Sequence, residues 1–203
     1  AVSMAIATST PRQLLPRDQR RAQILRAAAQ AFSRDGYAAT SVDEVAKQAG
    51  ITKLIVYRHF DSKAALYRSI LDEVATRLGE EWMANTDDEH QHGSAVRTLL
   101  TVARELPDGF RLLFVHAARE QEFAEYAEGF RSIQEELAER VVADRIVDEP
   151  LRTWTVRMMV RVVVASVLEW IEVGEPAGDE LFVDRATAGI RSLVVAISAP
   201  APV

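Results

Sequence analysis

The sequence predicts an all-α protein of about nine helices. In nearly every segment, apolar residues recur at the three- and four-residue spacing of a helix, and no segment shows the period-two alternation of a half-buried strand. Ser, Asp, Pro and Gly stand where these segments begin and end, as they do at helix boundaries. The 203 residues, 48% of them hydrophobic, are enough to bury a substantial core.

The first two helices have clear boundary signals. Apolar residues over 24–32 predict a helix that ends near Gly36, because glycine readily takes the left-handed conformation that closes a helix. Ser41 and Glu44 have the spacing of a capping box, in which hydroxyl and carboxylate satisfy free backbone amides. A short helix is therefore expected over 42–48.

Gly50 separates this short helix from a second one, in the arrangement of a helix-turn-helix. The second helix, which Thr52 is expected to cap, is the one that lies in the major groove of DNA in such motifs. It concentrates hydrogen-bond donors, as phosphate and base contacts require, in Thr52, Lys53, Tyr57, Arg58 and His59. Leu54 and Ile55 are hard to bury here, so they either contact thymine methyl groups or cover the neighbouring helix.

Six more helices are predicted. Asp61 and Ser62 begin one that reaches about Trp82, and the polar segment 85–93 is expected to be a loop. The remaining five start at Ser94, Pro107, Phe123, Pro150 and Asp179, and the last ends near Ile197. These boundaries predict a flexible arm over 1–16, a helix-turn-helix domain over 17–62, a helical body over 63–198 and a tail over 199–203.

The overall net charge of −6 hides an asymmetry between the two parts of the chain. Residues 1–70 contain 11 Lys or Arg and 5 Asp or Glu, whereas residues 71–203 contain 13 and 25. A basic head on an acidic body is typical of a protein that offers one end to a polyanion. An accidental division of solvated surface charge is the alternative.

A specific pattern runs from Ala27 to Leu66. It includes Asp43-Glu44-Val45-Ala46, Ala49-Gly50-Ile51-Thr52, Val56-Tyr57-Arg58-His59-Phe60 and Ser62-Lys63. This pattern resembles the N-terminal signature of TetR-family (tetracycline-repressor-like) transcriptional regulators. The resemblance implies a three-helix DNA-binding head, a larger helical ligand-binding body, and a homodimer joined through its last two long helices.

The resemblance also implies roles for single residues. It implies phosphate contacts at Thr40 and Ser41, recognition-helix contacts at Thr52, Lys53, Tyr57 and His59, and a DNA backbone contact at Lys63. Leu54 and Ile55 depart from the pattern, since relatives more often have a glycine or small residue followed by threonine or serine. The candidate interface with double-stranded operator DNA comprises Thr40, Ser41, Thr52, Lys53, Leu54, Ile55, Tyr57, Arg58, His59 and Lys63.

The last two helices are expected to form the dimer interface. The helix after Pro150 is apolar nearly all round over 158–168, which implies burial on most faces. The last helix offers a second apolar face with Phe182, Ile190 and Val194. With their two-fold mates they would build a four-helix interface, unless both are core helices of a monomer.

Aromatic residues gather on the middle helices, where the resemblance places a small-molecule effector. The cations beside them, including Arg157, could pair with a ligand carboxylate, but pairing with Glu120, Glu122 or Glu169 is the favoured interpretation. Core packing explains each aromatic residue singly, whereas a hydrophobic effector explains the set. The candidate pocket comprises Trp82, Phe110, Phe114, His116, Phe123, Tyr126, Phe130, Trp154, Met158 and Arg161.

Other function classes find no support in the sequence. Because there is no nucleophile motif or glycine-rich phosphate loop, neither an enzyme nor a cofactor is expected. His90 and His92 lie in a polar loop without supporting residues, so no metal site is expected. The longest apolar stretch, 158–168, is interrupted by Arg161 and falls short of the roughly 20 residues that cross a membrane. A chain without cysteine needs no oxidising compartment, so a cytoplasmic location is expected.

The sequence therefore predicts a homodimeric, ligand-responsive transcriptional regulator. We expect a repressor that a small hydrophobic effector releases from a palindromic operator. A helical protein-interaction module without sequence-specific DNA binding is the alternative.

Overall fold

The computed structural model describes residues 16–85 and 94–199, and within these ranges the chain is all-helical. This confirms the predicted fold class. Residues 1–15 of the predicted arm, residues 86–93 of the predicted loop, which include His90 and His92, and residues 200–203 of the predicted tail lie outside the described residues.

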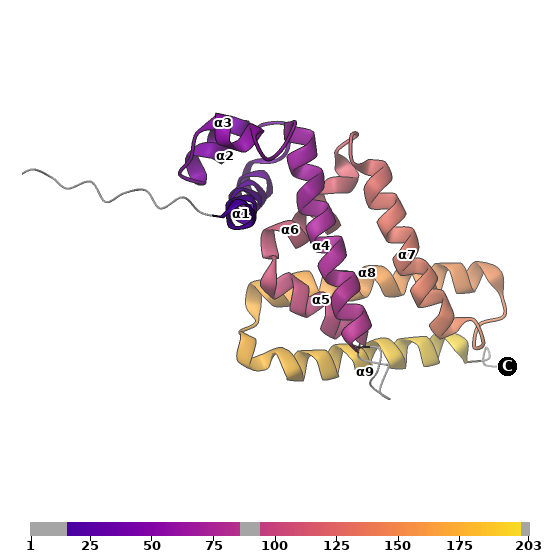
Figure 1. Cartoon of the computed structure of the whole chain (residues 1–203). Coiled ribbons are helices and arrows are strands. Elements are labelled where there is room, and N and C mark those ends of the chain that lie inside the picture. The colour runs from indigo at the N-terminus through magenta and orange to yellow at the C-terminus, as the bar shows by residue number, and fades with distance from the viewer. Residues whose placement is uncertain (1–15, 86–93, 200–203) are drawn as a thin grey trace, which may run out of the picture.

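Nine α-helices make up most of the described chain (Figure 1). They are α1 (Arg17–Asp35), α2 (Val42–Gln48), α3 (Lys53–Tyr57), α4 (Lys63–Asn85), α5 (Ser94–Glu105), α6 (Pro107–Arg111), α7 (Ala124–Val142), α8 (Glu149–Val173) and α9 (Asp179–Ser198). Two irregular turns follow α6, namely the π-helical η1 (Leu112–His116) and the 3-10 turn η2 (Ala117–Arg119). A third, η3 (Pro176–Gly178), precedes α9.

Helices α1 to α3 form a small head whose boundaries have chemical causes. Gly36 has a φ of +83° and ends α1 as predicted, donating its amide to the Phe32 carbonyl over 2.9 Å. The expected capping box is present, because the Ser41 hydroxyl accepts from the Glu44 amide while the Glu44 carboxylate accepts from the Ser41 amide. Gly50 has a φ of +66° and makes the turn before α3.

Helix α4 joins the head to the body through one continuous core. Leu66 and Tyr67 are fully buried on α4 and belong to a hydrophobic cluster that also contains Phe32 of α1 and Phe110 of α6. A smaller cluster around Met159 links the far ends of α7, α8 and α9. Helices α8 and α9 run side by side at the opposite end of the molecule from α3 (Figure 1).

Three helix starts lie where they are predicted but differ in local detail. Thr52 precedes α3 but makes no side-chain cap. The helix expected from Pro107 is regular for one short segment, α6, and then widens into η1 and tightens into η2. Gly178, not Asp179, caps α9, because the Asp179 carboxylate accepts hydrogen bonds from Arg104 and from the Trp170 indole instead. The Asp179 carboxylate therefore binds side chains of other helices and does not cap the first turn of α9.

Each helix of the described ranges is either too short or too polar to cross a lipid bilayer.

Candidate nucleic-acid interface and effector site

Helix α3 presents a polar face to solvent. Thr52, Lys53 and Arg58 are exposed, and Tyr57 is 44% exposed. Val56 is 1% exposed and anchors the helix on the head. The donors predicted on this helix are therefore accessible together, as contacts to phosphates and base edges require.

The turn before α3 is fixed from α1. The Gln23 side-chain amide donates a 2.8 Å hydrogen bond to the Ala49 carbonyl, and the Ile51 amide closes the turn on the Ala46 carbonyl over 2.9 Å. These bonds satisfy backbone groups that the break between the two helices would otherwise leave free. The orientation of α3 is consequently set by the whole head.

Lys53 is accessible but already paired. Its ammonium contacts the Asp43 carboxylate of α2 at 2.6 Å, and both side chains are largely exposed. An exposed pair of this kind contributes little stability, so the lysine can exchange its partner for a phosphate at small cost.

Thr40 and Lys63 have internal roles that the sequence did not indicate. Thr40 is 1% exposed, and its hydroxyl lies 2.7 Å from the Gly36 carbonyl oxygen. The structure therefore does not present the Thr40 side chain for the phosphate contact that the resemblance implies. The Lys63 ammonium donates to the Tyr37 and Thr40 carbonyls at 2.8 and 3.2 Å and lies 4.4 Å from the centre of the Tyr37 ring.

Leu54 and Ile55 have different environments in the structure. Leu54 is 63% exposed, which leaves it available to a thymine methyl group. Ile55 is partly buried and packs against the core of the head, as the alternative interpretation expects. Of the two residues, Leu54 is therefore the one that adds apolar surface to the exposed face of α3.

His59 lies at the far end of α3 among positive charges. It is partly buried, and burial together with the charges of Arg17, Arg20 and Arg21 holds the pKa of His59 below its ordinary value. The imidazole is thus held in its neutral form, in which it both donates and accepts a hydrogen bond.

The aromatic residues predicted to form one effector pocket lie in separate places. Phe110, Phe114 and Phe130 pack ring against ring, with centroid distances of 4.4 and 5.7 Å. Phe123 instead stacks on Tyr67 at 4.4 Å, and the Tyr126 hydroxyl donates to Asp72 of α4 over 2.8 Å. His116 is partly buried in η1, and Trp82 is partly buried on α4.

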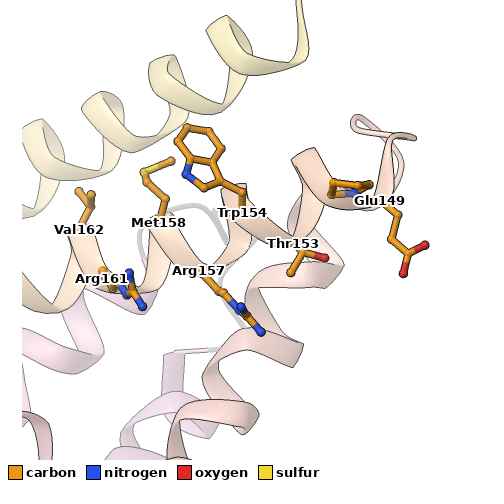
Figure 2. A pocket seen from close by; sticks show the side chains of 8 residues that line it. Glu149, Thr153, Trp154, Arg157, Met158, Arg161 and Val162 are labelled. Atoms are coloured by element: carbon orange, nitrogen blue, oxygen red, sulfur yellow. The ribbon is translucent and has the colours of Figure 1, made fainter.

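The rest of the predicted set lies on α8 and opens to solvent. Trp154, Met158 and Arg161 line a groove of about 610 Å³ on this helix. In Figure 2, Trp154 and Met158 point to one side of α8, and Arg157 points to the other. Trp154 is 54% exposed, and Arg157 pairs with Glu135 of α7 at 3.6 Å. The helical period thus places these residues on an outer face of α8, and their role in binding an effector stays a prediction.

Tyr37 has a role that the sequence does not indicate. This residue lies in the turn between α1 and α2, and its ring packs on Phe123 at 5.0 Å and on Tyr67 at 5.1 Å. A lone tyrosine after a glycine carries no periodic signal, so only the fold shows that it joins head and body.

The comparisons with known proteins agree with this geometry. Residues 24–70 match the model of the family described as bacterial regulatory proteins, tetR family. In this domain, the chain is similar to members of the TetR family. The family consists of transcriptional regulators and not of enzymes.

Individual relatives are similar over about half of this chain or less. The HTH-type transcriptional activator FasR of Mycolicibacterium smegmatis is 36% identical over 104 residues, which are 49% of this chain and 48% of the relative. The match thus spans about half the length of that curated relative.

Solved structures extend the similarity in fold to nearly the whole chain. A TetR-like transcriptional regulator from Rhodococcus sp. RHA1 superposes with a TM-score of 0.73 and 24% identity, covering 90% of this chain and 97% of the other. AibR, solved in complex with isovaleryl coenzyme A and operator DNA, superposes with a TM-score of 0.65 and 19% identity, covering 84% and 97%. The body thus has the fold of these TetR-like regulators.

Proposed function

We propose that this chain is a ligand-responsive transcriptional repressor that binds operator DNA as a homodimer. The observation that carries the proposal is the exposed donor face of α3 on a head that matches the tetR family model. Helix α3 would enter the major groove, with Lys53, Tyr57 and Arg58 at phosphates or base edges.

The charge distribution supports binding through the head. Residues 1–70 contain 11 Lys or Arg and 5 Asp or Glu, whereas the acidic body, with 13 and 25, would repel DNA. Ion pairs neutralise many body arginines, as in the pair of Arg104 with Asp179 at 2.8 Å and the pair of Arg97 with Glu180 at 2.6 Å. DNA is therefore expected to approach the side of the molecule that carries α3.

The outer faces of α8 and α9 support a homodimer. Large apolar side chains remain exposed along both helices, namely Leu151, Trp154, Val162, Leu181, Leu193 and Val195. Contiguous exposed apolar side chains of this size mark an interface, and a second copy would present the same stripe around a two-fold axis. The groove beside Trp154 and Met158 would then be filled by the partner instead of an effector.

The effector site is proposed beside η1. Phe114 and Phe130 are only partly buried, and His116 lies in the same irregular turn. Helical irregularities of this kind are frequent at functional sites, because they open the regular hydrogen-bond ladder. A hydrophobic ligand with an acidic group fits two phenyl rings and an imidazole. To act as a switch, it must prefer one spacing of the two heads.

The test is selection of bound fragments from random double-stranded DNA with the full chain. A dimer of helix-turn-helix heads should enrich an inverted repeat whose half-sites lie ~34–36 Å apart or a multiple of it. A selected site without dyad symmetry would contradict the dimer, and failure to enrich any sequence would favour the protein-interaction module. Hydrophobic acids, neutral aromatic compounds and sugars are then titrated against the selected complex, and only the apolar compounds should release DNA.

A further inference from the structure

The first turns of α1 lie against both ends of the recognition helix. At one end, Gln23 holds the Ala49 carbonyl in the turn before α3, and the Arg20 guanidinium donates to the Gln23 side chain over 2.6 Å. At the other end, the Arg21 guanidinium lies 5.1 Å from the centre of the Phe60 ring, just beyond α3. Any surface that docks on α3 therefore meets the start of α1 as well.

Three arginines share one face of these turns. Arg17, Arg20 and Arg21 have the i, i+3, i+4 spacing that places side chains together on a helix. Within the described residues, none of the three forms an ion pair, although Arg34 near the end of the same helix pairs with Asp35 at 2.7 Å. Neighbouring cations without an anionic partner repel one another, so binding of a polyanion would stabilise this cluster.

We infer that Arg17 and Arg20 bind backbone phosphates of duplex DNA beside α3, extending the interface beyond the helix-turn-helix. This inference rests on the proposed function of the head. The guanidinium group is suited to the role because its planar fork matches two phosphate oxygens at once. Phosphate contacts carry no sequence information, so the two arginines would add affinity without changing the preferred operator.

Arg20 also has a structural role through Gln23, which the experiment must separate from DNA binding. The Arg17 side chain is exposed and forms no hydrogen bond with the described residues, so its replacement leaves the turn intact. Arg26 supplies a matched control because it is an exposed arginine on α1 that forms no ion pair within the described residues. It lies two turns further from the start of the helix, and its charge acts on Glu73 and not on His59.

The experiment measures binding of the full chain to its selected operator and to a random duplex of equal length by fluorescence anisotropy, at ~50 to 200 mM salt. The variants are Arg17→Gln, Arg20→Gln, the double variant and Arg26→Gln. Each lost phosphate contact should lower the slope of log affinity against log salt by about 0.9 per head. The double variant should weaken binding to both duplexes by the same factor, and Arg17→Lys should restore part of the slope.

The outcomes separate this inference from the function on which it rests. If the unchanged protein binds no duplex, the proposed function fails. If it binds its operator but the double variant keeps the slope and affinity of Arg26→Gln, only the role of the two arginines is overturned. Thermal unfolding of each variant shows whether the turn before α3 is still folded. If Arg20→Gln is unfolded, the salt dependence of DNA binding by Arg17→Gln alone tests the inference.

Discussion

The Tyr37 hydroxyl donates a 2.8 Å hydrogen bond to Glu122 Oε2, which joins the turn between α1 and α2 to the segment before α7. The same turn is held from α4, because Lys63 donates to the Tyr37 carbonyl. Phe123, next to Glu122, adds an edge-on ring contact at 5.0 Å. Tyr37 thus adds to the attachment of the head to the body, and its backbone, ring and hydroxyl each contact a different partner.

Replacing Tyr37 with phenylalanine tests this attachment. We expect the free energy of unfolding to fall by about 1 kcal/mol, the usual net contribution of a side-chain hydrogen bond. Burial and the bond to Glu122 raise the pKa of Tyr37 to about 12, so the folded state holds the proton more tightly than the unfolded state. Stability should therefore fall as the pH rises from about 10 to 12. Denaturant unfolding at several pH values should show this loss reduced in the variant, and Glu122→Gln should add little to Tyr37→Phe.

Tyr67 gives the opposite prediction for the same type of substitution. Its side chain is fully buried, and its hydroxyl finds no hydrogen-bond partner among the described residues. A buried unsatisfied hydroxyl costs about 1–3 kcal/mol, so Tyr67→Phe should raise the free energy of unfolding by about 1 kcal/mol. Tyr67→Leu is the control, because it also removes the ring stacked on Phe123 and should destabilise. Equal destabilisation by both substitutions would show that the hydroxyl is satisfied.

Asp43 is predicted to weaken DNA binding in the unmodified protein. Its carboxylate neutralises Lys53 on the surface that would face phosphates. Asp43→Asn should tighten binding to every duplex by a similar factor, since it frees a cation and removes a like charge from the DNA side. Anisotropy titrations at low salt measure this gain, which should shrink as salt rises. A loss of affinity would instead assign Asp43 a positioning role.

DNA affinity is predicted to depend on the protonation of His59. In the free protein, burial and the charges of Arg17, Arg20 and Arg21 hold the pKa of His59 below 6.5, and nearby phosphates would raise it again. The complex then binds more protons than its components, so affinity should increase as the pH falls from about 7.5 to 6. His59→Gln should flatten this dependence. Without DNA, the lowered pKa predicts the reverse trend, with stability lost as the pH falls below 6.5.

The proposed dimer is tested on its exposed apolar stripe. Trp154→Asp combined with Val195→Asp should give a monomer, because an unpaired charge buried in an interface costs several kcal/mol. Val147→Asp is a matched control, since Val147 is 88% exposed and precedes α8. Sedimentation velocity distinguishes the species. A double variant that remains dimeric would show that the interface lies on another face of the protein.

The sequence alone determined the head and the helical class. Helix boundaries at Gly36, Ser41 and Gly50 depend on backbone conformation and local hydrogen bonds, which a short stretch of sequence contains in full. The donors on α3 could be predicted for the same reason, since Val56 is the one fully buried residue on so short a helix.

Only the tertiary structure decided the roles of residues whose partners are distant in sequence. Thr40 and Lys63 turn inward because carbonyls of the turn at 36–40 lie within reach of their polar groups. The aromatic residues of the body pack against different neighbours because each helix faces two or more others. The helical period of a sequence predicts that a residue is buried, but it does not show which neighbouring helix covers it. Phe123 thus packs beside the head, whereas Trp154 faces solvent on α8.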